Sequence, residues 1–307
     1  MEMINSFRSD KDRLAGSCRD KDYCSICGQD ADFKKLFTNW DYEGRRTYAI
    51  LECNSCKVKK TDPFPENIGY LYENDKCLTP RFHWLKSFLV RREIRQIVKL
   101  TNSKQFLEIG SGDGEFSESL NALGYYVVAS DASQKRPYYL EDKTEVPYIH
   151  FDYERMEIDD QRLVNGRTIV LRHVLEHIEK PAEFLKGLIH QNAKFFYIVV
   201  PNVASFERKI FGQYDCMWCL PQHLWHYDIH SLGRLFELLG LKLVSFGYEM
   251  TPTIAWHIRR YMIIKKFPRF MIMILDCRWF SLGLSLLLNI FFRNNVLWAL
   301  VESENKG

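Results

Sequence analysis

Three glycines set between two apolar segments constrain the fold of this chain more than any other feature. Residues 105–133 read QFLEIGSGDGEFSESLNALGYYVVASDAS. Gly110, Gly112 and Gly114 have the spacing G-x-G-x-G, one position short of the G-x-G-x-x-G that marks a dinucleotide-binding turn. The order of these segments predicts a β–loop–α–β unit. The two apolar runs would form parallel strands, the glycines the loop, and the stretch between them the helix.

Acidic residues around this loop argue against a phosphate ligand. Glu108 comes two residues before Gly110, and Asp113 lies inside the loop. Carboxylates repel phosphate, whereas they suit a ligand with an amino group, a sulfonium cation and sugar hydroxyls. Asp131 ends the second apolar run, where a carboxylate can accept hydrogen bonds from both hydroxyls of a ribose. The pattern therefore favours S-adenosylmethionine (SAM), which carries a ribose but no phosphate.

The segments LEIGSGDG and VVASD resemble the first motif and the acidic second-strand end of class I SAM-dependent methyltransferases. This resemblance implies an α/β, Rossmann-like sheet that is mostly parallel, with a closing antiparallel strand. It also implies that the loop and the strand ends hold the cofactor, through Glu108, Gly110, Ser111, Gly112, Asp113, Gly114, Asp131, Asp152, Arg172 and His173. The alternative is a glycine turn in another α/β domain, and an ordinary turn aspartate is an equal reading of Asp152.

Strands and helices are expected to alternate from residue 105 onward. The predicted parallel strands cover residues 105–110, 125–131, 147–152, 167–173 and 195–200, and the closing pair covers 241–250 and 295–303. Apolar residues return at helical spacing over 82–100, which predicts a helix before the first strand. Its arginines, Arg91, Arg92 and Arg95, are expected to face solvent.

Two C-x-x-C pairs near the N-terminus predict a structural zinc site. Cys24 and Cys27 form one pair, and Cys53 and Cys56 form the other. Four thiolates can close a tetrahedral Zn²⁺ site, and the intervening residues have the aromatic content of a zinc ribbon. A redox dithiol is the alternative, although it needs no second pair. A third pair, Cys216 and Cys219, has no partner pair, and buried thiols beside Trp218 are expected there.

The segment LRHVLEHIEK carries His173, Glu176 and His177 in the order H-x-x-E-H, an inverted zinc-protease pattern. We interpret the match as accidental, because the segment follows a predicted strand and resembles a turn that lies beside the cofactor in this methyltransferase group. Arg172 and His173 are then expected at the cofactor edge, with Glu176 and His177 behind them. A capping or core role is equally open for His177.

The segment CLPQHLWHYDIHS supplies the candidate catalytic residues. It resembles the P-x-H turn of methyltransferases that act on sugars, in which a glutamate precedes a basic histidine. Gln222 replaces that glutamate here, which weakens the expectation of C-methylation, and the pKa of His223 is expected near its ordinary value. The catalytic candidates are His223 as general base, Gln222 beside it, and His226 or Tyr227 as residues that assist or position the acceptor. Structural histidines at a helix start, including His230, are the alternative.

The order of these features predicts a polar tail (1–22), a zinc ribbon (23–62), a linker and leading helix (63–103) and a SAM domain (104–307) with a hydrophobic helical insertion at about 254–292. The arrangement resembles zinc-ribbon methyltransferases of bacterial sugar and polysaccharide pathways, which implies a small sugar-like acceptor, a nucleotide-sugar or a glycan precursor. The rivals are an RNA methyltransferase and a non-catalytic SAM-fold binding protein.

Composition bears on partners and location. The formal net charge is only +3, which argues against nucleic acid. The first 22 residues have no apolar core of signal-peptide length, so a cytoplasmic location is expected. The apolar run within 259–292 is too short to span a bilayer, and a buried or interfacial helix is expected there. The alternative is peripheral contact of this segment with the inner face of the membrane. The sequence does not indicate an oligomeric state.

Overall fold

The computed structural model describes residues 22–41, 46–65, 83–142, 145–151, 163–249 and 295–303, together with 258–259, 261–263, 265–268, 283 and 287. Asp152, the tail and nearly all of the predicted insertion at 254–292 therefore lie outside the described residues. None of the helices within the described ranges is long and apolar enough to cross a membrane.

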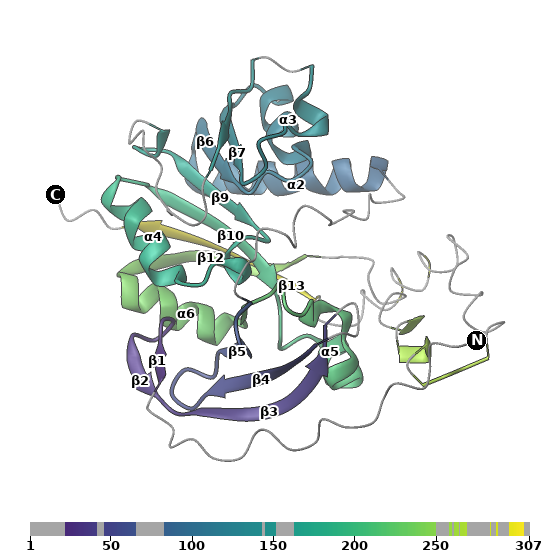
Figure 1. Ribbon diagram of the computed structural model, residues 1–307. Helices are drawn as coiled ribbons and strands as arrows, with labels where there is room; N and C mark the ends of the chain where they lie inside the picture. The colour runs from purple at the N-terminus through teal and green to yellow at the C-terminus, as the bar shows by residue number, and fades with distance from the viewer. Residues whose placement is uncertain are drawn as a thin grey trace.

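A seven-stranded sheet forms the centre of the molecule (Figure 1). Its strands are β6 (Gln105–Ile109), β7 (Tyr126–Asp131), β8 (Tyr148–His150), β9 (Thr168–Arg172), β10 (Phe195–Pro201), β12 (Leu241–Glu249) and β13 (Val296–Ser303). The spatial order is β12-β13-β10-β9-β6-β7-β8, and β13 runs antiparallel to both of its neighbours. The predicted fold, mostly parallel with a closing antiparallel strand, is confirmed.

Helices cover both faces of this sheet. On one face lie α2 (His83–Thr101) and α3 (Glu115–Ala122); on the other lie α4 (Pro181–His190) and α6 (Ile229–Leu239) (Figure 1). Neighbouring side chains of β6 alternate between the two cores, because Phe106 packs with α2 and α3 while Leu107 packs with α4 and α6. The arginines Arg91, Arg92 and Arg95 of α2 are exposed, as predicted.

The cysteine module, residues 22–62, is a hairpin followed by a small antiparallel sheet. The hairpin pairs β1 (Asp22–Cys24) with β2 (Gln29–Ala31), and the sheet contains β3 (Phe33–Trp40), β4 (Thr47–Cys53) and β5 (Lys59–Asp62). Its fourth strand is β11 (Trp225–His226), which comes from the P-x-H segment and pairs with β5. The module is therefore joined to the large domain through one sheet.

Helix α6 also holds the cysteine module. Gly28 has a φ of +68°, and a Cβ built on it would lie 2.8 Å from Cδ1 of Leu238 in α6. The positive φ favours glycine at this position, and the contact shows how closely the module approaches α6. The module and α6 share one hydrophobic core, in which the four cysteines pack with residues such as Leu232 and Leu235.

Candidate functional site

The glycine loop between β6 and α3 has a backbone that favours glycine at three positions. The φ angles are +77° at Gly110, +54° at Gly112 and +84° at Gly114. A Cβ on Gly114 would lie 2.8 Å from Cγ of Leu140, so the turn packs tightly on that side. A Cβ on Gly112 would meet nothing within 4 Å, which leaves an open side on the loop.

Asp131 at the end of β7 holds this loop from the side. Its Oδ2 accepts a hydrogen bond from the Gly112 amide at 2.9 Å, and its Oδ1 accepts one from the Ser133 amide at 3.0 Å. Each carboxylate oxygen keeps a further lone pair, so the carboxylate can also accept hydrogen bonds from ribose hydroxyls. The buried hydroxyl of Ser111 has no hydrogen-bond partner among the described residues. These groups fit a ligand that supplies hydrogen bonds at the loop.

Glu108 and Arg172 lie behind the loop. Glu108 is 2% exposed and accepts a hydrogen bond from Oγ of Ser117 in α3 at 2.5 Å, and burial raises its pKa to about 8. The Nε of Arg172 lies 3.1 Å from Oε1 of Glu93 in α2, and its guanidinium packs over the ring of Phe116. Both side chains brace the helices that flank the loop, and their direct contact with a cofactor stays a prediction.

The residues of the H-x-x-E-H pattern lie on the turn after β9, which is not an α-helix. His173 has a φ of +56°, and its side chain is largely exposed. The next residues form a 3-10 turn, η3 (Leu175–His177), in which Glu176 is fully buried. Nδ1 of His173 lies 3.4 Å from Oε1 of Glu176. The three side chains do not share one α-helical face, so the helix of a zinc protease is not formed.

The P-x-H segment folds back onto this turn. The Leu224 amide donates to the carbonyl oxygen of Glu176 at 2.8 Å, and Nε1 of Trp225 donates to the carbonyl of Glu179 at 3.0 Å. His177 and His223 consequently stand edge to face, with ring centroids 4.8 Å apart. Ligand-type atoms of Glu176, His177 and His223 all lie within 4.8 Å of one another. This group of three side chains is called the Glu-His-His cluster below.

His223 lies in the interior. Burial, together with the neighbouring His177 and His226, holds the pKa of His223 well below its usual range. The expectation of an ordinary pKa is therefore wrong, because the sequence showed the missing glutamate but not the burial. The imidazole is neutral at neutral pH, and it can accept a proton there. The Gln222 group that faces the cluster is its main-chain oxygen, 2.8 Å from Nδ1 of His177.

His226 and Tyr227, the two assisting candidates, both lie in the interior. Nε2 of His226 lies 3.0 Å from Oγ1 of Thr61, and its ring packs against Trp218, so it belongs to the junction with the cysteine module. Tyr227 is completely buried, and its hydroxyl has no hydrogen-bond partner among the described residues. Burial raises the pKa of Tyr227 well above its usual range. A catalytic role for His226 or Tyr227 stays a prediction. His230, at the start of α6, is exposed.

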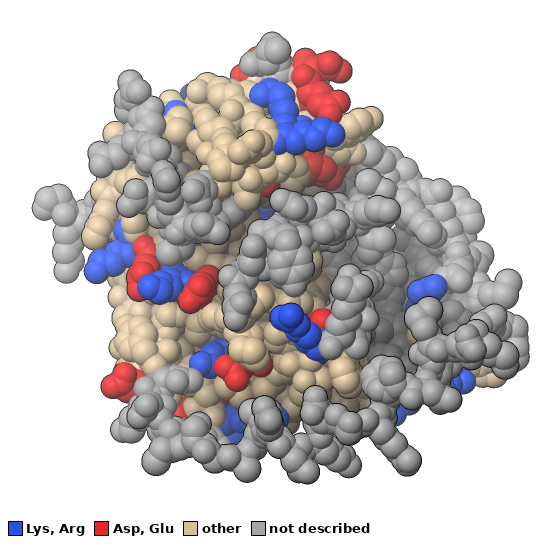
Figure 2. Space-filling model, in the orientation of Figure 1, with Lys and Arg blue, Asp and Glu red and all other residues tan. Residues whose placement is uncertain are grey.

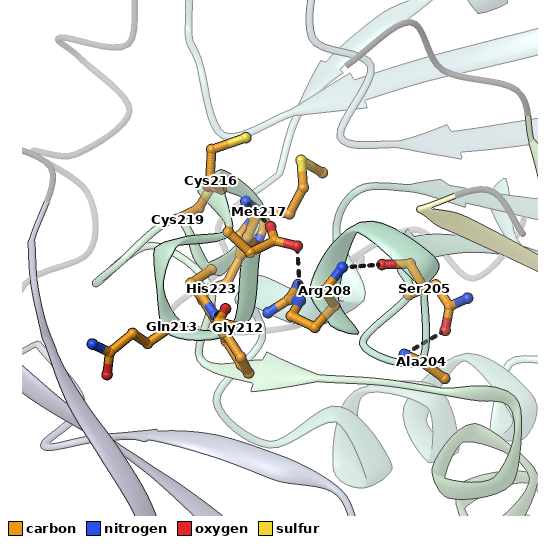
Figure 3. A network of polar contacts seen from close by, with 12 residues as sticks. Ala204, Ser205, Arg208, Gly212, Gln213, Cys216, Met217, Cys219 and His223 are labelled. Carbon is orange, nitrogen blue, oxygen red and sulfur yellow. Dashed lines mark hydrogen bonds and ion pairs between the residues drawn. The ribbon is translucent and has the colours of Figure 1, made fainter. Parts of the chain in front are cut away.

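A buried ion pair that the sequence analysis missed supports the P-x-H segment. Figure 3 shows the Arg208 side chain, from α5 (Phe206–Phe211), reaching toward the turn that carries Cys216, Met217 and Cys219. Its Nε lies 3.3 Å from Oδ2 of Asp215, and its guanidinium stacks on Trp218 at 3.7 Å. Cys216 and Cys219 are half-buried, so the expectation of buried thiols is wrong. Polar residues seven positions apart carry no periodic signal that could have revealed the pair.

The four cysteines of the module converge as predicted. Their sulfur atoms lie within 4.8 Å of one another, and those of Cys24 and Cys56 are 3.7 Å apart. A tetrahedron with Zn–S bonds of about 2.3 Å has an edge of about 3.8 Å. The hydrogen bond between the Cys24 and Cys56 sulfurs lowers the pKa of Cys24 to about 5, while burial raises the pKa of Cys27 to about 11. Four thiolates so close need a cation, and this donor set fits zinc.

Comparison with known proteins decides the family. Residues 82–246, more than half of the chain, match a family model described as a methyltransferase domain. The chain belongs to this methyltransferase family. It is a SAM-dependent methyltransferase, and the matched range contains the glycine loop, Asp131 and the Glu-His-His cluster. No curated protein matches the methyltransferase significantly.

Solved structures resemble this methyltransferase at low sequence identity. A SAM-dependent methyltransferase from Archaeoglobus fulgidus is 18% identical, with a TM-score of 0.46 over 70% of this chain and 94% of that one. The plantazolicin methyltransferase is 14% identical, with a TM-score of 0.44 over 77% and 90%. Magnesium protoporphyrin IX methyltransferase from Synechocystis PCC 6803 is 14% identical, with a TM-score of 0.42 over 55% and 78%. The family assignment rests on the sequence match.

Proposed function

We propose that this enzyme methylates a small sugar-like acceptor, such as a nucleotide-sugar or a glycan precursor, with His223 as the general base. The observation that carries the proposal is the Glu-His-His cluster, a largely buried polar group built on the turn after β9. Strand β9 runs parallel to β6, so the turn after β9 and the loop after β6 leave the sheet at the same edge. A methyl donor at the loop and an acceptor at the cluster would then be neighbours.

In this proposal His223 accepts the proton of the acceptor, and main-chain carbonyls orient His223 and His177. SAM, when bound, would supply a methyl group on a sulfonium, whose sulfur leaves as a neutral thioether when the acceptor attacks the methyl carbon in line. Nδ1 of His223 lies 3.1 Å from the carbonyl oxygen of Met217, which can only accept, so Nδ1 carries a hydrogen and Nε2 is left to take the acceptor's proton. His177 is oriented in the same way by the carbonyl of Gln222. Alignment of donor and acceptor provides the rest of the rate enhancement.

The four cysteines of the module are proposed to hold one structural Zn²⁺. The support is their burial, their mutual distances and their chemistry. Since β5 of this module pairs with β11, the ion would also stabilise the segment that carries His223. A metal placed there acts on the reaction only through this connection.

An RNA acceptor is the second candidate, and it rests on the pairing of a cysteine module with the exposed arginines of α2. Figure 2 shows Lys and Arg side chains interspersed with Asp and Glu over the described parts of one face, without a basic patch there. A backbone-binding surface for nucleic acid would gather positive charge. The Glu-His-His cluster, with its polar side chains close together, suits a small acceptor better.

The test is a methyl-transfer assay with labelled SAM. The full chain is incubated with a fractionated small-molecule extract, with nucleotide-sugars and with total RNA, and the labelled product is identified by mass spectrometry. Label in a sugar-containing product supports the proposal. Label in RNA supports the second candidate, and SAM binding without any labelled product supports a non-catalytic binding protein.

A further inference from the structure

The Glu-His-His cluster brings two imidazole rings and a carboxylate together, and a main-chain carbonyl orients each ring. Nδ1 of His177 is 2.8 Å from the carbonyl oxygen of Gln222, and Nδ1 of His223 is 3.1 Å from that of Met217. Because a carbonyl oxygen only accepts, both Nδ1 atoms carry the hydrogen, and Nε2 of each ring has the lone pair. Histidines that bind metals are commonly oriented through such a bond from the other ring nitrogen.

Glu176 makes the cluster electrostatically incomplete. Its side chain is fully buried, and neither carboxylate oxygen has a hydrogen-bond partner among the described residues. Nδ1 of His173 lies 3.4 Å from Oε1, on a side chain that is 41% exposed. A buried carboxylate without a hydrogen-bond donor is strongly destabilising, so a cation at this place would compensate it.

Two imidazole nitrogens and one carboxylate are a donor set that first-row transition metals take, with coordination positions left for water or another ligand. One ring nitrogen of each histidine and one carboxylate oxygen of Glu176 already lie within 4.8 Å of one another. Bonds of about 2.1 Å would place them roughly 3.4 Å apart in a tetrahedron. The cluster therefore needs only side-chain adjustment to close around an ion.

We propose that Glu176, His177 and His223 form a second metal site, separate from the four cysteines, for a divalent ion such as Zn²⁺ or Co²⁺. The Nε2 lone pair of His223 cannot bind a metal and accept a proton at the same time. Occupation of the site therefore inhibits methyl transfer. This consequence for activity rests on the proposed function, whereas binding of the metal does not.

Metal content of the full chain tests the site. The protein is saturated with Zn²⁺, dialysed and analysed by mass spectrometry for metals, and two equivalents per chain are expected. Glu176→Gln and His177→Ala should each retain one equivalent, and Cys53→Ser should lose the other. Unchanged melting temperatures and SAM affinities in Glu176→Gln and His177→Ala show that these two cluster variants fold. One equivalent in the parent, or two in both cluster variants, would overturn the proposal.

Cobalt spectra identify the ligands. Co²⁺ added to protein that already carries one zinc should give weak visible bands without the thiolate charge-transfer absorption that a cysteine-bound ion shows, and Glu176→Gln should abolish them. Strong thiolate bands instead would place the ion on cysteines and refute the site. Turnover should fall as the second equivalent binds. Two equivalents without any methyl transfer to sugars would remove the proposed function and leave the metal site standing.

Discussion

At the scale of single residues, the hydrogen bond from Nδ1 of His223 to the carbonyl oxygen of Met217 orients the ring for its proposed role as a base. We expect His223→Ala to keep its SAM affinity, because the residue is separate from the glycine loop, and to lose turnover by about 10²- to 10⁴-fold, as is usual for a general base. Calorimetry and the labelled-methyl assay measure the two effects. His230→Ala, on the exposed surface of α6, is the matched control. Normal turnover in His223→Ala would show that His223 is not the general base.

Asp131 is the residue on which the cofactor assignment most depends. Its carboxylate already accepts two amide hydrogen bonds from the loop, from Gly112 and Ser133. We expect Asp131→Ala to weaken SAM binding by about 1.5 to 3 kcal/mol, the range for hydrogen bonds to a charged group. Asp131→Asn keeps one acceptor oxygen and should lose less. Calorimetric affinities equal to that of the parent in both variants would contradict a ribose contact.

At the scale of elements, Glu108 links β6 to α3 and makes stability depend on pH. Its raised pKa, about 8, means that the folded protein keeps the Glu108 proton at pH values where the unfolded chain has released it. Stability from this group is therefore present at low pH and falls as pH rises from about 4.5 to about 8. Glu108→Gln cannot ionise, so its stability relative to the parent should increase through that window.

Thermal unfolding of both proteins between pH 5 and pH 8.5 measures this effect. The full difference is on the order of 5 kcal/mol at most, since each pKa unit corresponds to about 1.4 kcal/mol. The hydrogen bond with Ser117 is open to the glutamine as well, so packing is largely preserved. A stability difference that does not change with pH would show that Glu108 is ionised in the folded protein.

At the scale of the whole molecule, the cysteine module and the catalytic segment share a sheet. Thr61 in β5 donates to the carbonyl oxygen of His223 at 2.6 Å and contacts His226. We expect Cys53→Ser to lose the zinc equivalent of the module and, through this connection, to lower both the melting temperature and turnover. Metal analysis, calorimetry and the methyl assay measure these changes. A full zinc equivalent in this variant would defeat the metal assignment, and unchanged turnover would show that the two parts are uncoupled.

The sequence by itself determined the features that depend on neighbouring residues. Glycines at 110, 112 and 114 give the loop its positive φ angles, and Asp131 follows from the end of an apolar strand. Strand and helix positions agreed with the predictions within one or two residues, since each depends on local hydrophobic periodicity. The two C-x-x-C pairs also act locally, as each turn aims two sulfurs at one point.

Only the tertiary structure decided what segments distant in the chain do together. It placed Glu108 against α3 and Arg172 against α2. The neighbours of a strand side chain depend on which helix covers that face of the sheet. It brought His223 to Glu176 and His177, and it added β11 to the cysteine module. Such contacts form through long-range packing, which leaves no period or spacing in the sequence.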